Sequence, residues 1–194
     1  MKLAQFVGQE SVKRQLTAMI KVARDPSRSP PYILLCGRSG MGKKTLAHII
    51  AGELGKTFRE CANPLAFRPG DLAALLTNLD DGDLLIIRDI ELVQGEVLEC
   101  LIQAVKEFQL DIMIGKGPTE RLIKLDLKHF TLVGTTTKPS QVDKRLRQSM
   151  VAYDFAPYST DEIGQIIELQ LKERGFVIDR DALDLLAKHG GASP

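Results

Sequence analysis

The chain has 194 residues, of which 44% are hydrophobic and 26% are charged. Its 26 Lys and Arg residues nearly balance its 25 Asp and Glu residues, and the net charge of +1 excludes a strongly basic protein that coats nucleic acid and a polyacidic tail. The apolar content excludes a largely disordered chain. We find neither the roughly 20 uninterrupted apolar residues of a membrane span nor the apolar core of a signal peptide. We therefore expect a cytoplasmic protein that has no contact with a membrane.

The cysteines and histidines are scattered along the chain. An odd number of cysteines cannot pair completely, and each one lies in or beside an apolar segment, so we expect reduced, buried thiols. The histidines do not cluster with them, and we predict no structural metal. These residues are Cys36, Cys61, Cys100, His48, His129 and His189.

The first part of the chain alternates helices with short apolar strands. Residues 9–23 have apolar side chains at helical spacing, and the prolines within residues 25–31 end this helix. Residues 32–36 are a continuous apolar run, which is typical of a strand buried on both faces of a parallel sheet. A glycine-rich loop, a helix over residues 43–54 and a strand over residues 58–61 follow.

The same alternation continues to about residue 155. Two helices, three further core strands and one β-hairpin, which turns at a Gly-Lys-Gly-Pro sequence, are predicted there. The helices span 71–79 and 96–108, the core strands 84–87, 130–136 and 151–155, and the hairpin strands 110–114 and 122–127, around Gly115-Lys116-Gly117-Pro118.

Beyond Pro157 the pattern is helical only, with helices over 160–174 and 179–189. The Ser159-Thr160-Asp161-Glu162 sequence supplies a hydroxyl cap and early acidic residues, which favour a helix start. Strands that alternate with helices predict an α/β protein with a parallel sheet. We therefore divide the chain into a large α/β domain over 1–156 and part of a helical small domain over 157–194.

The loop between the first strand and the second helix predicts a nucleotide site for ATP or ADP. Gly37, Gly42 and Lys43 match the pattern G-x-x-x-x-G-K of a phosphate-binding loop, and Gly40 adds a further glycine. The glycines let backbone N–H groups converge on a phosphate, while the helix N-terminus adds positive potential. Lys43 is placed to reach the outer phosphates.

The metal-binding hydroxyl expected after that lysine is missing, which puts Mg²⁺ in doubt. Lys44 occupies its position, and an ammonium cannot ligate a cation. Thr45 is rotated by about 100° around the helix and does not replace it without a rearrangement. We assign no residue as a metal ligand.

The partner strand departs in the same way. Residues 84–87 are followed by Arg88 where an Asp is expected and by Asp89 where a catalytic Glu is expected. A register slip of one residue would correct the first position, but it would reverse every apolar side chain, so we reject it. Three interpretations stay open: Lys44 and Arg88 supply the positive charge of the metal, Asp89 or Glu91 pairs with Arg88 and turns it away, or Arg88 only extends from the sheet edge into solvent.

From Phe6 to its C-terminus the chain resembles the RuvB family, the AAA+ motor subunits of the bacterial Holliday-junction branch-migration complex. The segment Leu110-Asp111-Ile112-Met113-Ile114-Gly115-Lys116-Gly117-Pro118 is the most specific match, since it resembles a hairpin of that family and not of AAA+ proteins in general. The other matching segments are 6–9, 45–51, 69–79 and 130–137.

The resemblance implies an AAA+ P-loop core with an inserted hairpin and a role in DNA recombination and repair. It implies that the hairpin over 110–127 docks a RuvA-like partner and that the chain joins a homo- or hetero-oligomer of RuvB-like subunits. Thr137 falls at the family's sensor position. Phe6, Val7 and Tyr158 fall where the family places its base pocket, although Tyr158 would serve equally as an aromatic residue at the edge of the core.

The departures from the family coincide with its chemistry. Ser149 stands at the arginine-finger position, and Arg147, two residues earlier, is the substitute we consider. The family's winged-helix DNA-binding domain has no counterpart, so we expect little direct DNA binding. Three readings stay open: a nucleotide-binding module with weak or lost hydrolysis, a working ATPase or helicase subunit that uses Asp89 and Thr45, and a nucleotide-free interaction domain.

Overall fold

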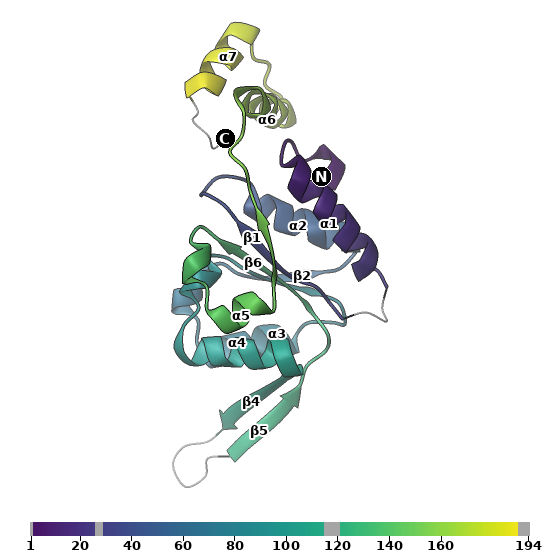
Figure 1. Ribbon diagram of the computed structural model, residues 1–194, viewed down its shortest axis with the longest axis vertical. Coiled ribbons are helices and arrows are strands. Elements are labelled where there is room, and N and C mark those ends of the chain that lie inside the picture. The colour runs from purple at the N-terminus through teal and green to yellow at the C-terminus, as the bar shows by residue number, and fades with distance from the viewer. Residues whose placement is uncertain (1, 26–28, 115–120, 190–194) are drawn as a thin grey trace.

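The computed structural model describes residues 2–25, 29–114 and 121–189, and it places a parallel sheet between two layers of helices (Figure 1). The strands are β1 (Tyr32–Cys36), β2 (Phe58–Cys61), β3 (Leu84–Ile87), β4 (Gln109–Ile114), β5 (Arg121–Asp126), β6 (Thr131–Thr136) and β7 (Val151–Asp154). The helices are α1 (Glu10–Ala23), α2 (Lys43–Leu54), α3 (Pro69–Thr77), α4 (Gly95–Glu107), α5 (Lys144–Gln148), α6 (Thr160–Glu173) and α7 (Arg180–His189). Short 3₁₀ helices are η1 (Leu3–Gln5), η2 (Pro64–Ala66), η3 (Ile90–Leu92) and η5 (Pro139–Gln141).

The main sheet has the strand order β2-β3-β6-β1-β7, and every neighbouring pair is parallel. The segments that follow the strands therefore gather at one edge, where crevices of open α/β sheets bind ligands. The α/β class with a parallel sheet, predicted from the alternation of strands and helices, is confirmed.

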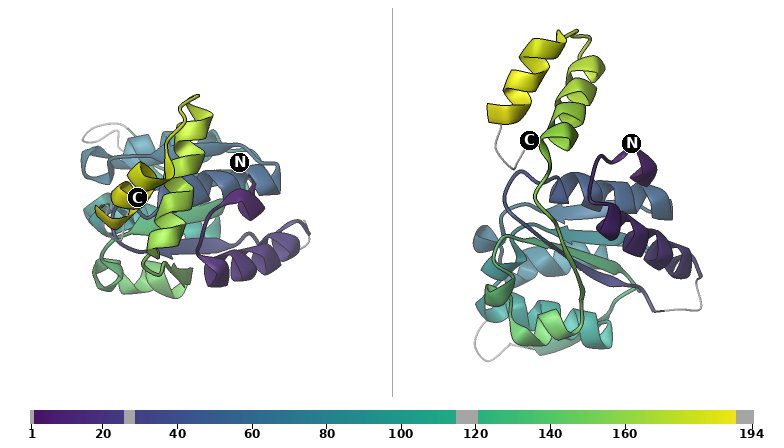
Figure 2. Two further views of the ribbon diagram at one scale, coloured as in Figure 1. Left: turned by 90° about the horizontal axis from the view of Figure 1, so that it is seen from above. Right: turned by 45° about the horizontal axis from the view of Figure 1, so that its top comes forward.

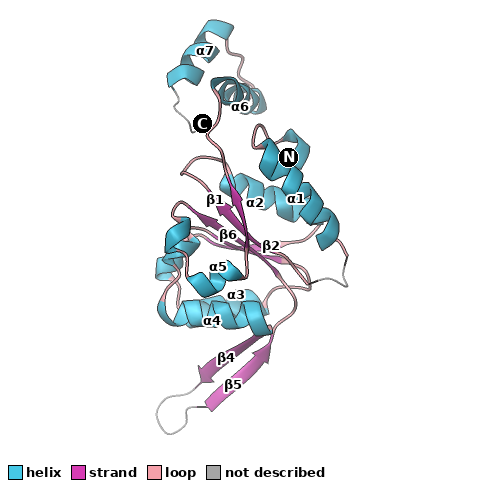
Figure 3. Ribbon diagram, viewed as in Figure 1, coloured by secondary structure: helices cyan, strands magenta, loops and turns pink. Residues whose placement is uncertain are grey.

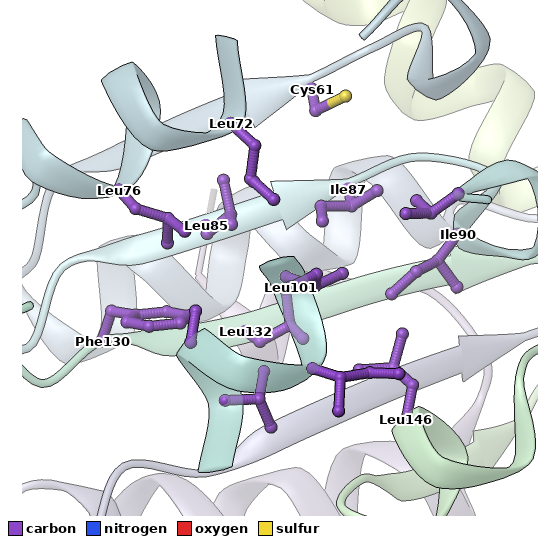
Figure 4. Packing of buried hydrophobic residues seen from close by; sticks show 14 of the residues in the cluster. Cys61, Leu72, Leu76, Leu85, Ile87, Ile90, Leu101, Phe130, Leu132 and Leu146 are labelled. Atoms are coloured by element: carbon purple, nitrogen blue, oxygen red, sulfur yellow. The ribbon is translucent and has the colours of Figure 1, made fainter. Parts of the chain in front are cut away.

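The central strands β1, β3 and β6 bury both of their faces, which explains the continuous apolar sequences of β1 and β3. β7, predicted as a core strand, is an edge strand that exposes three of its four residues. Leu34 of β1 and Leu85 of β3 face a core shared with α3, α4 and α5, and part of this core is drawn in Figure 4. Their neighbours Ile33 and Leu84 face a second core shared with α1 and α2. The helices on the two sides of the sheet are seen in Figure 3.

Most of the predicted elements lie within two residues of their observed bounds. The prediction for α3 starts and ends two residues late, because Pro69 occupies the first turn, where its missing N–H costs nothing. Helix α5 was not predicted at all. It has five residues, four of them polar, and it depends on Asp143, whose carboxylate accepts a hydrogen bond of 2.8 Å from the backbone N–H of Arg145.

The hairpin forms a separate two-stranded antiparallel sheet that projects away from the main sheet (Figure 1). Two of the three residues expected to form an apolar face do not form a free surface, because Leu110 is 1% exposed and Ile112 packs against the core. The side chain of the third, Ile114, lies outside the described part of the structure. The predicted turn over residues 115–118 lies outside the described residues. The described apolar side chains that this hairpin does expose are Leu122 and Ile123 on β5.

Helices α6 and α7 pack on each other beyond the carboxyl edge of the sheet, close to the N-terminal segment (Figure 2). The predicted helix start is confirmed, since the Ser159 hydroxyl accepts from the backbone N–H of Glu162 and the Glu162 carboxylate accepts from Ser159 in return. The domain division at residue 156 stays a prediction. No helix in the described ranges is long and apolar enough to cross a membrane.

Candidate nucleotide site

The glycine-rich loop between β1 and α2 has backbone geometry that only glycine adopts easily. Gly40 and Gly42 both have a φ of +81°, in the left-handed region where a side chain is strained. A Cβ atom on Gly42 would lie 2.9 Å from the ring of Phe6, and one on Gly37 would lie 2.9 Å from Cβ of Phe155. The loop is therefore closely packed between the N-terminal segment and the chain after β7.

Lys43 is folded back onto this loop. Its ammonium group donates hydrogen bonds of 2.6 Å to the carbonyl oxygens of both Gly37 and Arg38, and the residue is only 8% exposed. Burial lowers the pKa of Lys43, while the nearby carboxylates of Asp89 and Glu91 oppose that shift. A phosphate group bound in the loop would accept the hydrogen bonds that the Lys43 ammonium now donates to these two carbonyl oxygens.

A cavity of about 460 Å³ opens beside the loop, between the N-terminal segment and α6. It brings together Phe6, Val7 and Tyr158, the three residues that the family resemblance assigns to the base pocket. The Tyr158 hydroxyl donates a hydrogen bond of 3.2 Å to the carbonyl of Met41 and so ties the loop to the segment just before α6. We call this segment together with α6 and α7 the lid. Thr45 lines this cavity too, and it is therefore directed toward the base side of the site.

Lys44 and Arg88, the residues at the two expected metal-ligand positions, converge on Glu60 of β2. The ammonium of Lys44 lies 3.2 Å from Oε1 of Glu60, and the guanidinium of Arg88 lies 3.8 Å from the same oxygen. His48, one helical turn after Lys44, lies 3.2 Å from Oε2. Burial by itself would raise the pKa of the Glu60 carboxyl, but its contacts with Lys44 and His48 outweigh burial and hold that pKa below its usual value.

This arrangement does not fit a magnesium ion. Both groups at the metal positions are donors without a lone pair for a cation. Within the described ranges, no three His, Cys, Asp or Glu residues lie together as a metal-binding group. The predicted pairing of Arg88 with Asp89 or Glu91 is wrong, because its guanidinium lies beside Glu60 instead.

The segments after β3 and β6 form a second polar cluster. Asp89 has a φ of +47° and starts η3, and its backbone N–H donates to the Thr135 hydroxyl over 3.3 Å. Glu91 is 8% exposed, and its Oε1 accepts from the backbone N–H of Thr137 at 3.2 Å and from its hydroxyl at 3.4 Å. Thr137, the expected sensor residue, is therefore held by a buried carboxylate.

Arg147 lies on α5, in the helix layer on the opposite face of the sheet from α2. Burial and the carboxylate of Asp154 raise the pKa of Cys36 to about 11, and the positive charge of Arg147 partly opposes them. The Ser149 hydroxyl donates to the carbonyl of Arg145 over 3.3 Å. Whether Arg147 acts on a neighbouring subunit stays a prediction.

Sequence reasoning missed Glu60 and His48, and it did not connect Glu91 with Thr137. Glu60 is an acidic residue inside a predicted strand, and its partners Lys44, His48 and Arg88 are 16, 12 and 28 positions away in the sequence. One signal was available: two cations at neighbouring positions of one site favour a nearby anion, and Glu60 is near the carboxyl end of a strand at the same edge.

The strand order, the glycine-rich loop and the cavity under the lid helices define a P-loop domain of the AAA+ class. The family profile described as "Holliday junction DNA helicase RuvB P-loop domain" matches residues 1–154, and the chain belongs to this family.

Individual relatives agree with this assignment. The "Holliday junction branch migration complex subunit RuvB" of Thermosipho melanesiensis is 40% identical over 193 residues, which cover 98% of this chain and 61% of that protein. The subunit of the same name from Kosmotoga olearia is also 40% identical, over 100% of this chain and 57% of that protein. The chain therefore spans about three fifths of the length of these relatives.

The fold agrees with solved structures as well. The structure titled "Thermotoga maritima RuvB Holliday junction branch migration motor" superimposes with a TM-score of 0.86 at 32% identity and covers all of this chain and 60% of that one. A mutant of the same protein gives a TM-score of 0.87 at 33% identity, covering 99% of this chain and 60% of that one.

Proposed function

We propose that this chain is a nucleotide-binding RuvB-family module in which ATP hydrolysis is weak or lost. The observation that carries the proposal is the contrast within one site. The loop, its lysine and the cavity beside Tyr158 keep the form of a nucleotide site, whereas Lys44 and Arg88 put cations where metal ligands are required. Such a site holds phosphates and lacks the means to activate water.

The alternative is a working ATPase, as expected of a branch-migration subunit. It would need Thr45 and Asp89 to supply the metal shell. Thr45 lines the base cavity, and the Asp89 backbone is held by Thr135 in a left-handed conformation. Both observations favour the hydrolysis-deficient module.

Two measurements on the same preparation test the proposal. We expect ADP and ATP to bind in a calorimetric titration, and we expect steady-state hydrolysis at least about a thousandfold below that of an intact AAA+ enzyme. Brisk Mg²⁺-dependent hydrolysis would establish the ATPase instead. Failure to bind any nucleotide would favour the nucleotide-free interaction domain.

A partner surface on the hairpin is the second proposed role. The two curated relatives are named as subunits of a branch migration complex, and we propose that a RuvA-like protein docks on the hairpin over 110–127. The projection of β4 and β5 from the sheet and the exposure of Leu122 and Ile123, at 55% and 40%, support this proposal.

The docking proposal predicts that Leu122→Asp abolishes capture of the chain by an immobilised RuvA-like partner. Val177→Asp is the matched control, since Val177 is fully exposed between α6 and α7 at the opposite end of the molecule (Figure 1). Equal capture of both variants would remove the hairpin from the interface.

A further inference from the structure

The strongest feature that the proposed function does not explain is the carboxylate of Glu60 between two cations. Building on the proposed nucleotide binding, we propose that Glu60 holds Lys44 and Arg88 as an internal substitute for the metal ion. The site then binds nucleoside polyphosphates without magnesium, and the negative charge of Glu60 lowers its affinity for them.

The cluster joins the same parts of the fold that a metal ion would bridge. Lys44 lies in the first turn of α2, Arg88 directly follows β3, and Glu60 on β2 contacts both. The position of Arg88 is fixed by its backbone N–H, which donates to the carbonyl of Cys61, the neighbour of Glu60, over 3.0 Å. An ion cluster therefore connects α2 to the edge of the sheet without any ligand.

Charge determines what this cluster offers a phosphate. Lys44 and Arg88 are two cations and Glu60 is one anion, so the three groups keep one net positive charge, whereas a magnesium ion brings two. The cluster partly compensates a bound polyphosphate and leaves no open coordination position for a divalent cation. A magnesium ion would add repulsion from both Lys44 and Arg88 and would gain no ligand from them.

The cations are held loosely enough to be redirected. Oε1 of Glu60 is buried, yet no partner meets it in hydrogen-bond geometry. Its distances of 3.2 and 3.8 Å to the two cations exceed the roughly 2.7–2.9 Å of a strong charge-assisted hydrogen bond. Lys44 and Arg88 are also half exposed, with side-chain exposures of 51% and 40%. Their long side chains can therefore turn from Glu60 toward an added phosphate, against the attraction of the carboxylate.

The test is a calorimetric titration of ATP, ADP and AMP into the full chain, once with EDTA and once with excess Mg²⁺. For the unmodified chain we expect nearly equal ATP affinities in the two buffers. Glu60→Gln adds one unit of net positive charge, so ATP affinity in EDTA should tighten by about tenfold, and the gain should decrease from ATP to AMP. Lys44→Gln should weaken ATP binding in EDTA.

Glu99→Gln is the matched control, because Glu99 on α4 pairs with Arg145 on α5, on the face of the sheet opposite α2. This substitution should leave all affinities unchanged. Circular dichroism confirms that each variant is folded. If Mg²⁺ strongly tightens ATP binding to the unmodified chain, or if folded Glu60→Gln fails to tighten it in EDTA, the inference is overturned while the proposed nucleotide binding stands. If no protein binds any nucleotide, the proposed function fails, and this inference fails with it.

Discussion

At the scale of single residues, Gly42 is the position where backbone geometry and packing together exclude a side chain. Its φ is +81°, and a Cβ atom would lie 2.9 Å from the Phe6 ring. We predict that Gly42→Ala lowers the free energy of unfolding by about 1–3 kcal/mol, from left-handed strain and the displacement of Phe6. Nucleotide affinity should fall as well, since the loop must shift. Urea unfolding and the titration described above measure the two effects.

Gly52→Ala is the control for that prediction. Gly52 lies inside α2, ten residues further along, and a Cβ atom there meets nothing within 4 Å. Alanine should raise the free energy of unfolding by about 0.5–1 kcal/mol through helix propensity. Equal effects of the two substitutions would show that the close approach to Phe6 does not constrain the loop.

Glu60 gives the chain a specific dependence on acid. Its folded-state pKa lies below the ordinary 4.5, because its contacts with Lys44 and His48 outweigh burial. A group with a depressed folded-state pKa stabilises the fold above its unfolded pKa, and this contribution is lost as pH falls through the folded value. The stability difference between the unmodified chain and Glu60→Gln should therefore be largest near neutral pH and shrink below about pH 4.5.

Urea unfolding of both proteins at several pH values measures this difference. Glu168→Gln, which alters an exposed residue of α6, serves as the reference substitution. A difference between Glu60→Gln and the unmodified chain that stays constant from neutral pH to about pH 3 would contradict the assigned pairing.

The residues of the site divide by how far apart their partners lie in the sequence. Gly37, Gly42 and Lys43 form a local pattern whose geometry follows from one strand, one loop and one helix, so their place was predictable. Glu60 has no local signal, since its role arises only when the strand order puts β2 next to β3 and α2 brings Lys44 above it. Charge balance across strands is not visible in a linear sequence without the register.

At the scale of elements, the hairpin combines a buried base with an exposed outer strand. Leu110 on β4 is 1% exposed, whereas Leu122 on β5 is 55% exposed. We predict that Leu110→Ala lowers the free energy of unfolding by about 2–5 kcal/mol, because it leaves a cavity under α4. Leu122→Ala should change it by no more than about 0.5 kcal/mol. Comparable losses in urea unfolding would mean that the whole hairpin is part of the core.

Strands were the most predictable elements and short helices the least. A run such as Leu84–Ile87, apolar at every position, fits a strand that is covered on both faces, and the observed burial agrees. α5 has too few residues to show an apolar period, and its one buried residue, Leu146, contacts a core assembled by other elements. Its existence is set by tertiary packing together with the Asp143 cap, and helix propensity contributes little.

At the scale of the whole molecule, the N-terminal segment and the lid meet beside the phosphate loop. Tyr158 at the start of the lid bonds to Met41 of the loop, and Gln9 of the N-terminal segment exchanges two hydrogen bonds with Ala156. A ligand under α6 therefore contacts segments from both ends of the chain. Its binding should couple the lid to the large domain and raise the unfolding temperature with the logarithm of ligand concentration once that concentration exceeds Kd.

The charge of the whole chain also sets its behaviour toward DNA. The net charge is +1, and several of its basic side chains are already paired, as Lys44 and Arg88 are with Glu60 and Arg145 is with Glu99. Phosphate neutralisation supplies most of non-specific DNA affinity, and a net charge of +1 leaves little excess of positive over negative charge for it. We predict that the chain binds a four-way junction at physiological salt no more tightly than the non-specific range of about 10⁻⁴–10⁻⁶ M.

Fluorescence anisotropy with a labelled junction and a matched linear duplex measures both affinities across a salt series. We expect weak binding, equal for the two DNAs, that disappears as salt increases. A junction affinity in the nanomolar range at physiological salt would show instead that the folded surface concentrates positive charge in a way that the balanced composition conceals.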